Sequence, residues 1–431
     1  MAAPDVYTEF EWRGMVYEST EGLRDALRRD RFTCYIGFDP TASSLHVGSL
    51  LPMMALARLQ RFGHSPIAIV GGGTGLIGDP SGKSGERSLL SREQVRENLE
   101  GIKAQLAKVL DFDAPGNPAR IVDNAEWLCE IDLMSFLRDI GKHFTVNYML
   151  AKESIRRRLE LEDGISYTEF SYLLLQAFDF LTLFDRYGCT LQLGGSDQWG
   201  NITAGTDLIR RLRGAKAHGL VLPLVTTTTG VKFGKTEAGT VWLDPSRTSP
   251  YAFYQFWFNT DDRDVVAYLK YFTFLDETEI GELEASLRSE PEKRVAQREL
   301  AREVTRLIHG EEALARAEEA SSRLFADSSG GWRSAAEVLE VLSDVPATEV
   351  AESRFDPPGI AITELLITTG LASSKSEAAR LVRGGGVYVN GERVADERGR
   401  VTFAQAIDGK VLVLQKGPRS KHVVKLTGKG A

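Results

Sequence analysis

The sequence predicts an α/β protein with a mostly parallel sheet, followed by a helical region and a small α+β domain. Three observations predict this order. Short apolar strands alternate with helical segments in the first half of the chain. Residues 249–342 have a charged, helical pattern without strand runs, and residues 359–431 return to two short helices followed by strands. The 431 residues are too many for one ordinary core, so two or three domains are expected.

The first strands and helices have clear local signals. "FTCYIGF" (32–38) and "SPIAIVGG" (65–72) are apolar enough for buried strands, and a helix from Gly48 to Phe62 is expected between them. Gly63 ends that helix. Further expected elements are a helix over 91–110 that opens with a Ser91 and Gln94 capping box, strands over 119–123, 189–195 and 220–226, and a buried, largely apolar helix over 168–188.

Later segments predict the domain boundaries. "SDVPATEVAESRFDPPG" carries three prolines and no clear periodicity, so it reads as a linker. After it, Asn390-Gly391 marks a two-residue hairpin turn. The sequence therefore predicts domains over residues 1–245, 246–342 and 359–431, with a linker over 343–358.

Composition and charge narrow the class of protein. No run of eighteen apolar residues is present, so no membrane span is expected. Three widely spaced cysteines fit a reducing cytosol and argue against disulfides and zinc, and six scattered histidines weaken a catalytic-metal interpretation. The net charge of −8 divides into +6 on residues 359–431 and −14 on the remainder. A basic tail on an acidic body suggests a polyanion as the partner of the tail.

A glycine-rich stretch follows the second strand and has three possible readings. Residues 73–78, "GTGLIG", match the G-x-G-x-x-G fingerprint of dinucleotide-binding proteins, but "DPSGKSGER" follows where a helix should run on. Residues 78–84 resemble a P-loop with one residue too few between its glycines. A connection that lets the backbone approach some ligand is favoured over either motif.

"DPTASSLHVGSL" (39–50) lies where the first strand passes into a helix. A helix start offers free N–H groups and a positive dipole end, which suit an anion. His46 can add hydrogen bonds to a phosphate, and Gly48 permits close approach. A lone histidine is more often structural, so this stretch needs support from elsewhere.

Two further loops follow strands. "TTTTGVKFGKTEAGT" (226–240) brings Lys232 and Lys235 to one glycine-rich loop, which suits a di- or triphosphate whose charge shifts during reaction, although a solvated loop has the same composition. "LQLGGSDQWGNITAG" (191–205) holds Asp197 and Gln198 in a glycine-lined turn, where Asp197 could instead be an N-cap.

The buried helix carries three polar residues on one face. Tyr172, Gln176 and Asp179 are spaced four and three apart. Buried polar groups need hydrogen-bond partners, which a polar ligand or a structural network would supply.

Taken together, these stretches resemble the bacterial tyrosyl-tRNA synthetases, a class I aminoacyl-tRNA synthetase family. "DPTASSLHVGS" is similar to the family's HIGH motif and "KFGKT" (232–236) to its KMSKS motif. "GGSDQWGNITAG" and "TEFSYLLLQAFDF" are similar to its amino-acid pocket segments, and "AITELLITTG…VYVNGERV" resembles an S4-type RNA-binding domain. Ser49 replaces the second His of HIGH, and "KFGKT" departs from KMSKS at its second, third and last positions.

The resemblance implies a Rossmann-like catalytic domain and a two-step reaction. The tyrosine carboxylate attacks the α-phosphate of Mg·ATP, pyrophosphate leaves, and tRNA(Tyr) then takes the tyrosyl group. The family pattern also implies a cytoplasmic homodimer with no membrane partner and no metal held by the protein itself.

The resemblance also implies a role for each matching residue. His46 and Thr41 would stabilise the phosphates, and Lys232 and Lys235 would hold the departing pyrophosphate. The expected ATP site comprises Gly37, Asp39, His46, Gly48, Ser49, Asp197 and Lys235. The expected tyrosine site comprises Tyr35 and Asp179 at the phenol, Asp79, Tyr172 and Gln176 at the ammonium group, and Gln198 near the carboxylate. Lys375, Arg380 and Arg383 are the expected tRNA contacts.

Three alternatives remain open at this point. A tryptophanyl-tRNA synthetase shares the fold but would not need Tyr35 with Asp179. An RNA-binding or splicing protein on a former synthetase scaffold would not need to keep Tyr35, His46, Asp197 and both lysines. A nicotinamide-dependent oxidoreductase rests only on the glycine-rich stretch.

Overall fold

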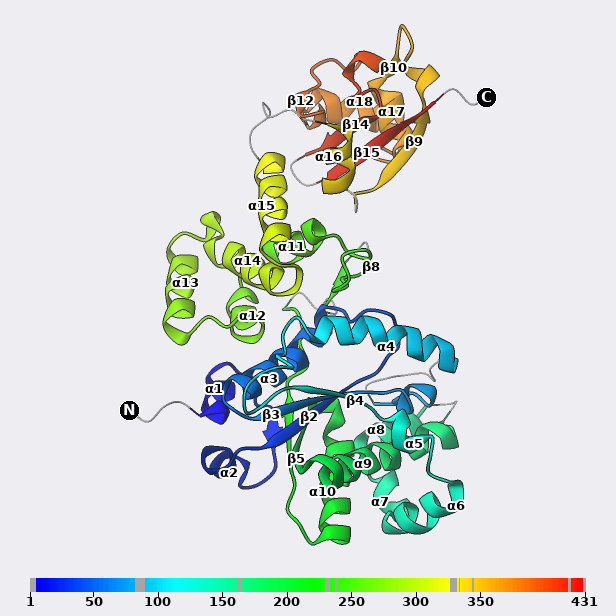
Figure 1. Ribbon diagram of the computed structural model, residues 1–431. Coiled ribbons are helices and arrows are strands. Elements are labelled where there is room, and N and C mark those ends of the chain that lie inside the picture. The colour runs from blue at the N-terminus through cyan, green and yellow to red at the C-terminus, as the bar shows by residue number, and fades with distance from the viewer. Residues whose placement is uncertain are drawn as a thin grey trace. The chain divides into compact units, whose positions relative to one another are not determined.

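The structure is a computed structural model that describes residues 5–81, 90–161, 164–228, 233–236, 239–325, 332, 334–342, 345–417 and 420–428. The chain divides into two compact units, Met1–Arg247 with Phe256–Ile308, and Thr248–Gln255 with His309–Ala431. Each unit holds one large sheet, and Figure 1 labels most of the strands and helices.

The first unit is built on a six-stranded sheet in the order β1-β6-β5-β2-β3-β4. All neighbouring pairs are parallel except β1 with β6 at one edge, so the predicted parallel sheet is confirmed. The chain runs outward from β2 to β4 and then returns to the other side of β2 with β5, so the strand order reverses between β2 and β5. The strands are β1 (Glu18–Ser19), β2 (Thr33–Phe38), β3 (Ser65–Val70), β4 (Arg120–Asp123), β5 (Cys189–Gly195) and β6 (His218–Leu222).

Helices cover both faces of this sheet. In Figure 1, α3 (Leu50–Arg61) and α4 (Arg92–Leu106) lie on one side, and α9 (Tyr167–Tyr187) and α10 (Trp199–Arg213) lie on the other. Tyr35 of β2 belongs to the core on the α9 side, where its ring meets Phe180 edge to face. The smaller helices of this half are α1 (Val6–Trp12), α2 (Leu23–Arg29), α5 (Ala125–Leu128), α6 (Leu133–Ser135), α7 (Val146–Leu150) and α8 (Glu153–Leu159).

Several sequence expectations hold and others need correction. The capping box of Ser91 and Gln94 opens α4 as predicted. The strand predicted over 220–226 begins earlier and ends at Leu222, because Pro223 has no N–H to continue the ladder. The "GTGLIG" stretch forms only a short 3-10 turn (η2, Thr74–Leu76), and no helix runs on from Gly78 over the next described residues. The dinucleotide interpretation therefore fails, while the P-loop-like residues 82–84 lie outside the described residues.

The helical region predicted over 249–342 is present. Its members are α11 (Pro250–Phe258), α12 (Val265–Phe272), α13 (Glu277–Ser289), α14 (Val295–His309), α15 (Glu311–Phe325) and α16 (Ala335–Val341). Within the described ranges, every helix is too short or too polar to span a lipid bilayer.

Two buried arginines join this helical region to the first half of the chain. Arg58 of α3 is 1% exposed and donates to the carbonyl oxygens of Lys270, Tyr271 and Thr273 at the end of α12. Arg13 donates to the carbonyl of Lys270 as well, at 2.9 Å. These last carbonyls of α12 have no intrahelical partner, so the guanidinium groups satisfy them and complement the helix dipole. We call this contact the arginine brace.

The second unit ends in a five-stranded sheet in the order β12-β11-β14-β15-β9. Asn390 and Gly391 have φ of 51° and 88°, so the predicted hairpin between β11 and β12 is confirmed. The elements are β9 (Ala347–Ala351), β10 (Ile360–Ala361), α17 (Ile362–Thr368), α18 (Lys375–Arg383), β11 (Val387–Val389), β12 (Glu392–Arg393), β13 (Arg400–Val401), β14 (Val411–Lys416) and β15 (Ser420–Thr427).

The predicted linker over 343–358 is wrong in its central part. Ala347–Ala351 form β9, which pairs parallel with β15. Immediately before it, α16 covers the same sheet, since Val338 and Leu342 pack with Val411 and Val423. The opposite face of the sheet packs on α17 and α18. The strand β9 was not predicted because its sequence is polar, lies in a proline-bearing stretch, and pairs with a strand far along the chain.

Candidate active site

A cavity of about 340 Å³ opens at the carboxyl ends of β2 and β5, where the strand order reverses. This is where an open parallel sheet is expected to hold its ligand. Ten of the residues selected from the sequence line it: Tyr35, Gly37, Asp39, Ser49, Asp79, Tyr172, Gln176, Asp179, Asp197 and Gln198.

The inner end of the cavity pairs a free hydroxyl with a carboxylate. The Tyr35 hydroxyl is buried and has no hydrogen-bond partner among the described residues, although the residue is only 1% exposed. The Asp179 carboxylate accepts from Trp127 Nε1 at 2.7 Å and from Asn124 Nδ2 at 2.9 Å. Burial raises the pKa of Asp179 to about 7 despite these two bonds, which lower it. This end of the cavity therefore offers an unused hydroxyl donor and a carboxyl group whose pKa lies near neutral pH.

A second polar network lies nearer the strand ends. Asp79 accepts from Gln198 Nε2 at 2.7 Å and from the backbone N–H of Ser81 at 2.8 Å. Burial, with a smaller effect from Asp39, raises the pKa of Asp79 to about 6. Gln176 Nε2 donates to Gln198 at 3.2 Å, which joins the α9 face to the turn after β5. A cationic group would bind well here, since it would relieve the cost of the buried Asp79 charge.

Residues 46–49, which we call the His46 segment, lie at the start of α3, and Ser49 lines the cavity. His46 Nδ1 accepts from the Gly48 backbone N–H at 3.0 Å, so a neutral ring carries its proton on Nε2. A Cβ at Gly48 would lie 2.7 Å from His46 Cε1, so a side chain there would displace the ring. The predicted helix start is preceded by one 3-10 turn, η1 (Val47–Ser49). Thr41 is exposed on the loop before it.

The lysine-bearing stretch returns to this segment through its backbone. The Val47 N–H donates to the Val241 carbonyl at 3.1 Å, and the Val241 N–H donates to the Gly234 carbonyl at 3.0 Å. The short strands β7 (Lys235–Thr236) and β8 (Gly239–Thr240) form the hairpin between them. The backbone of Lys235 is therefore adjacent to the His46 segment, while its side chain and all of Lys232 lie outside the described residues.

Comparisons with known proteins agree along nearly the whole chain. Residues 27–326 match the model for class I tRNA synthetases (W and Y), and residues 337–424 match that for the tyrosine–tRNA ligase SYY-like C-terminal domain. A tyrosine–tRNA ligase of Roseiflexus castenholzii is 58% identical over 98% of this chain and 99% of its own length. That of Bacillus caldotenax is 52% identical with the same coverage. The chain belongs to the tyrosine–tRNA ligase family.

A solved structure carries the same family assignment. The C-terminally truncated mitochondrial tyrosyl-tRNA synthetase of Aspergillus nidulans is 31% identical, and the match covers 75% of this chain and 95% of that one, with a TM-score of 0.68. The predicted fold class and the predicted ligase family are therefore confirmed, and the oxidoreductase alternative is excluded. As in its family, this enzyme uses ATP.

Three residues in or directly behind the cavity were not predicted from the sequence. Asn124 and Trp127 follow β4 and hold Asp179, and Asn124 Oδ1 also accepts from the backbone N–H of Gly73 at 2.8 Å. Gln192 lines the cavity opposite Tyr35 in the β2–β5 register, and its buried Oε1 has no partner among the described residues. The position of Asn124 at the carboxyl end of a predicted strand was a usable signal. Nothing local marks Trp127 or Gln192.

The predicted tRNA contacts lie on α18. Lys375, Arg380 and Arg383 are all exposed. Arg383 forms an ion pair with Glu397 at 2.8 Å, whereas neither Lys375 nor Arg380 pairs with a described acidic residue. Of these three cations, Arg383 is partly neutralised, and the other two have no acidic partner in the described part of the chain.

Proposed function

We propose that the cavity binds L-tyrosine, that the enzyme activates it with Mg·ATP, and that it then transfers the tyrosyl group to tRNA(Tyr). The observation that carries this assignment is the buried, unpartnered Tyr35 hydroxyl beside Asp179 in the cavity. A substrate phenol would accept from Tyr35 and donate to Asp179. A phenylalanine ring would leave both groups without that bond, which is costly in a buried site.

The remaining polar network would hold the amino acid end. Asp79, Tyr172 and Gln176 would bind the ammonium group, and Gln198 would lie near the carboxylate while keeping its bond to Asp79. With its ammonium neutralised by Asp79, the bound tyrosine presents its carboxylate toward the open end of the cavity. Asp39 accepts from Tyr172 at 3.5 Å and would lie near the adenosine.

Adenylate formation joins a tyrosine carboxylate oxygen to the α-phosphorus of ATP and breaks the bond from that phosphorus to the bridging oxygen of pyrophosphate. The protein's contribution is positioning and charge stabilisation. His46 and Thr41 would bind the phosphates, and Lys232 and Lys235 would neutralise pyrophosphate as it leaves. Gly37, Gly48 and Ser49 would line the adenosine side, and Asp197 would bind ribose. Mg²⁺ would enter with the ATP phosphates, its usual mode in such sites.

Transfer completes the reaction. The terminal ribose hydroxyl of tRNA attacks the carbonyl carbon of tyrosyl-adenylate, the ester bond forms, and AMP leaves. The proton lost by the hydroxyl can pass to the departing phosphate oxygen, so the step needs no further protein base.

One assay tests the assignment directly. Tyrosine-dependent exchange of pyrophosphate into ATP should be rapid, and tryptophan and phenylalanine should support it poorly. Exchange with tryptophan at the tyrosine rate would contradict the phenol assignment. Exchange with no amino acid preference would contradict the whole site.

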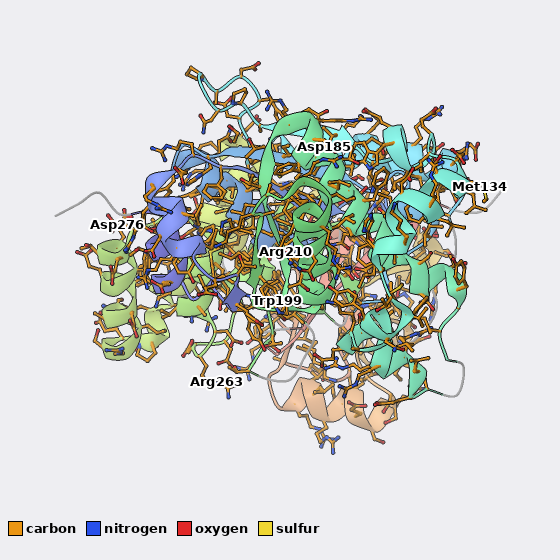
Figure 2. All side chains as sticks on the ribbon, turned by 90° about the horizontal axis from the view of Figure 1, so that it is seen from below. Met134, Asp185, Trp199, Arg210, Arg263 and Asp276 are labelled. Atoms are coloured by element: carbon orange, nitrogen blue, oxygen red, sulfur yellow. The ribbon has the colours of Figure 1, made fainter. Side chains whose placement is uncertain are left out.

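We also propose that the enzyme is a homodimer. Exposed apolar side chains gather between residues 133 and 167, and Met134 stands at the margin of the molecule in Figure 2. The most exposed of these apolar residues are Leu133 at 69%, Met134 at 72% and Tyr167 at 75%. Large exposed apolar patches mark interfaces. Tyr167→Asp should shift the protein from dimer to monomer in light scattering, whereas Tyr17→Asp, at a tyrosine that is 66% exposed elsewhere, should not.

We propose that the C-terminal region binds tRNA. We propose a module from α16 to the end of the chain, in place of the predicted start at residue 359, because α16 and β9 pack into its sheet. Lys375→Ala and Arg380→Ala should each reduce the salt dependence of tRNA binding by about one unit of slope. Arg383→Ala should have a smaller effect because Glu397 already pairs with it. We place the enzyme in the cytoplasm, which suits its free thiols at Cys34, Cys129 and Cys189.

A further inference from the structure

Phe233 lies at the base of the lysine-bearing hairpin, with its side chain buried in an aromatic cluster on α11 and α12. The residue is 7% exposed. Its ring stacks on that of Phe272, with 5.5 Å between the ring centroids and 3° between the ring planes. It also meets the Tyr268 ring edge to face, with 5.1 Å between the centroids. Phe256 and Trp257 of α11 complete the cluster, at ring distances of 5.8 and 5.9 Å. The Phe233 side chain therefore anchors the hairpin on the helical region.

The next residue joins the hairpin to the His46 segment. Gly234 has φ of 78°, and a Cβ there would lie 2.8 Å from Val47 Cγ2. The Val241 N–H donates to the Gly234 carbonyl, and Val241 in turn accepts from Val47. Two successive residues thus hold Lys235 between two supports, with the Phe233 ring on α11 and α12 and the Gly234 backbone against the start of α3.

The chain that enters the hairpin is held by the same helix. The Thr228 N–H donates to the Asp264 carboxylate at 3.2 Å, and the Tyr268 hydroxyl donates to the Thr226 carbonyl at 3.2 Å. Asp264 and Tyr268 are both buried. Tyr268 therefore contacts Thr226, before the hairpin, through its hydroxyl, and contacts Phe233 through its ring. In this way α12 supports the chain on both sides of residues 229–232.

We propose that Phe233 is a positioning residue for adenylation, because its aromatic anchor sets where the Lys235 backbone stands relative to His46. The inference rests on the proposed function in one respect, that Lys235 acts on the pyrophosphate. A ring that only filled the core would affect stability alone. A positioning ring affects the rate of adenylate formation through Lys235, and leaves tyrosine binding at the inner cavity unchanged.

Single-turnover adenylate formation in the full-length enzyme tests the proposal, with tyrosine affinity measured separately at equilibrium. Phe233→Ala should lower the rate on the order of 10- to 100-fold, the scale of a small misplacement of a reacting group. Tyrosine affinity should change less than about twofold, which is the scatter expected between sites that do not interact. Phe233→Leu keeps most of the side-chain volume but not the flat ring face, so it should lose part of the rate. This variant can replace Phe233→Ala if the alanine variant does not fold. Phe10→Ala, at a fully buried ring of α1, is the matched control and should lower the melting temperature without lowering the rate.

A double-mutant cycle separates positioning from general damage. If Phe233 acts through Lys235, then Phe233→Ala in a Lys235→Ala background should lower the rate by less than about threefold. An equal loss in both backgrounds, an unchanged rate in the single variants, or a parallel loss of tyrosine affinity would overturn the proposal. Failure of the wild-type enzyme to exchange pyrophosphate with tyrosine would instead reject the proposed function, so the two failures are distinguishable.

Discussion

Trp127 donates its indole N–H to the Asp179 carboxylate at 2.7 Å, so the carboxylate is already oriented before any ligand binds. Asn124 fixes the other oxygen at 2.9 Å. A carboxylate has about four acceptor positions, which leaves room for a third bond to a substrate hydroxyl. The inner end of the cavity is therefore preorganised on the Asp179 side and has an unused hydroxyl on the Tyr35 side.

Tyr35→Phe and Asp179→Asn should each narrow the preference for tyrosine over phenylalanine, measured as the ratio of kcat/KM values in the exchange assay. The Asp179 variant should lose more, because a charge-assisted bond contributes about 1.5–3 kcal/mol. Asp179→Asn also sets a new amide donor against those of Trp127 and Asn124, so circular dichroism must confirm folding. An unchanged ratio in both variants would reject the phenol assignment.

The stability of Tyr35→Phe distinguishes a binding hydroxyl from a structural one. In the free enzyme the substitution should be neutral or stabilising by up to about 1 kcal/mol, because it removes a buried oxygen that has no partner. Tyr7→Phe is the matched control, since the Tyr7 hydroxyl bonds to Ser19 Oγ at 3.1 Å and its loss should destabilise. Urea unfolding of the two variants measures the difference. A clear loss of stability in Tyr35→Phe would mean that its hydroxyl already has a structural role.

Asp179 should make the folded state less stable as pH rises. Its pKa of about 7 exceeds the ordinary value of 3.8, so between these pH values the folded protein binds more protons than the unfolded chain. The free energy of unfolding therefore falls across that window, and Asp179→Asn should remove this part of the fall. Urea titrations should show that the free energy of unfolding of the variant, relative to that of the wild type, increases from about pH 4 to pH 7.

Asp79→Asn provides the companion measurement. The pKa of Asp79 is raised to about 6, so the corresponding gain should be smaller and should be complete about one pH unit earlier. A difference between variant and wild type that stays constant with pH would contradict the elevated pKa in either case.

Lys235→Ala should reduce the rate of adenylate formation about 100- to 1,000-fold, as the loss of one transition-state donor does. The KM for tyrosine should stay nearly constant, because the lysine would interact mainly with departing pyrophosphate. Lys216→Ala, at an exposed lysine before β6, is the matched control and should have no effect. A Lys235→Ala enzyme with normal rate and weak tyrosine binding would show that the lysine acts elsewhere.

Truncation after Phe325 should leave pyrophosphate exchange almost intact and abolish efficient, salt-dependent charging of tRNA. A cut at Pro357 should behave worse, because it removes β15 and leaves β9 and the apolar side of α16 uncovered. Size-exclusion chromatography should show association for the Pro357 cut and a single species for the Phe325 cut. Charging that survives either cut would reject the tRNA role of the tail, and exchange lost after the Phe325 cut would make the tail a support for catalysis.

Local patterns predicted most of the parallel sheet, because its strands and helices carry clear periodicity and caps. The pocket residues were predicted through the family resemblance, since spacing alone could not choose between a ligand and a structural network on α9. Trp127 and Gln192 were not predictable in this way, as their roles depend on how β4 and β5 pack beside α9 and β2. The same limit hid β9, whose partner strand lies more than seventy residues further on.

The arginine brace has a consequence for recombining this enzyme with its relatives. Composition alone would place a crossover near residue 245 and treat the following helices as an exchangeable cassette. Arg58 binds carbonyls at 270, 271 and 273, so the helix that begins at the His46 segment and the helix that supports Phe233 share one buried junction. A hybrid that takes residues 250–275 from a distant relative places foreign carbonyl groups against the native Arg58 guanidinium, which is buried. Successful hybrids should therefore carry Arg13, Arg58 and residues 270–275 from the same parent.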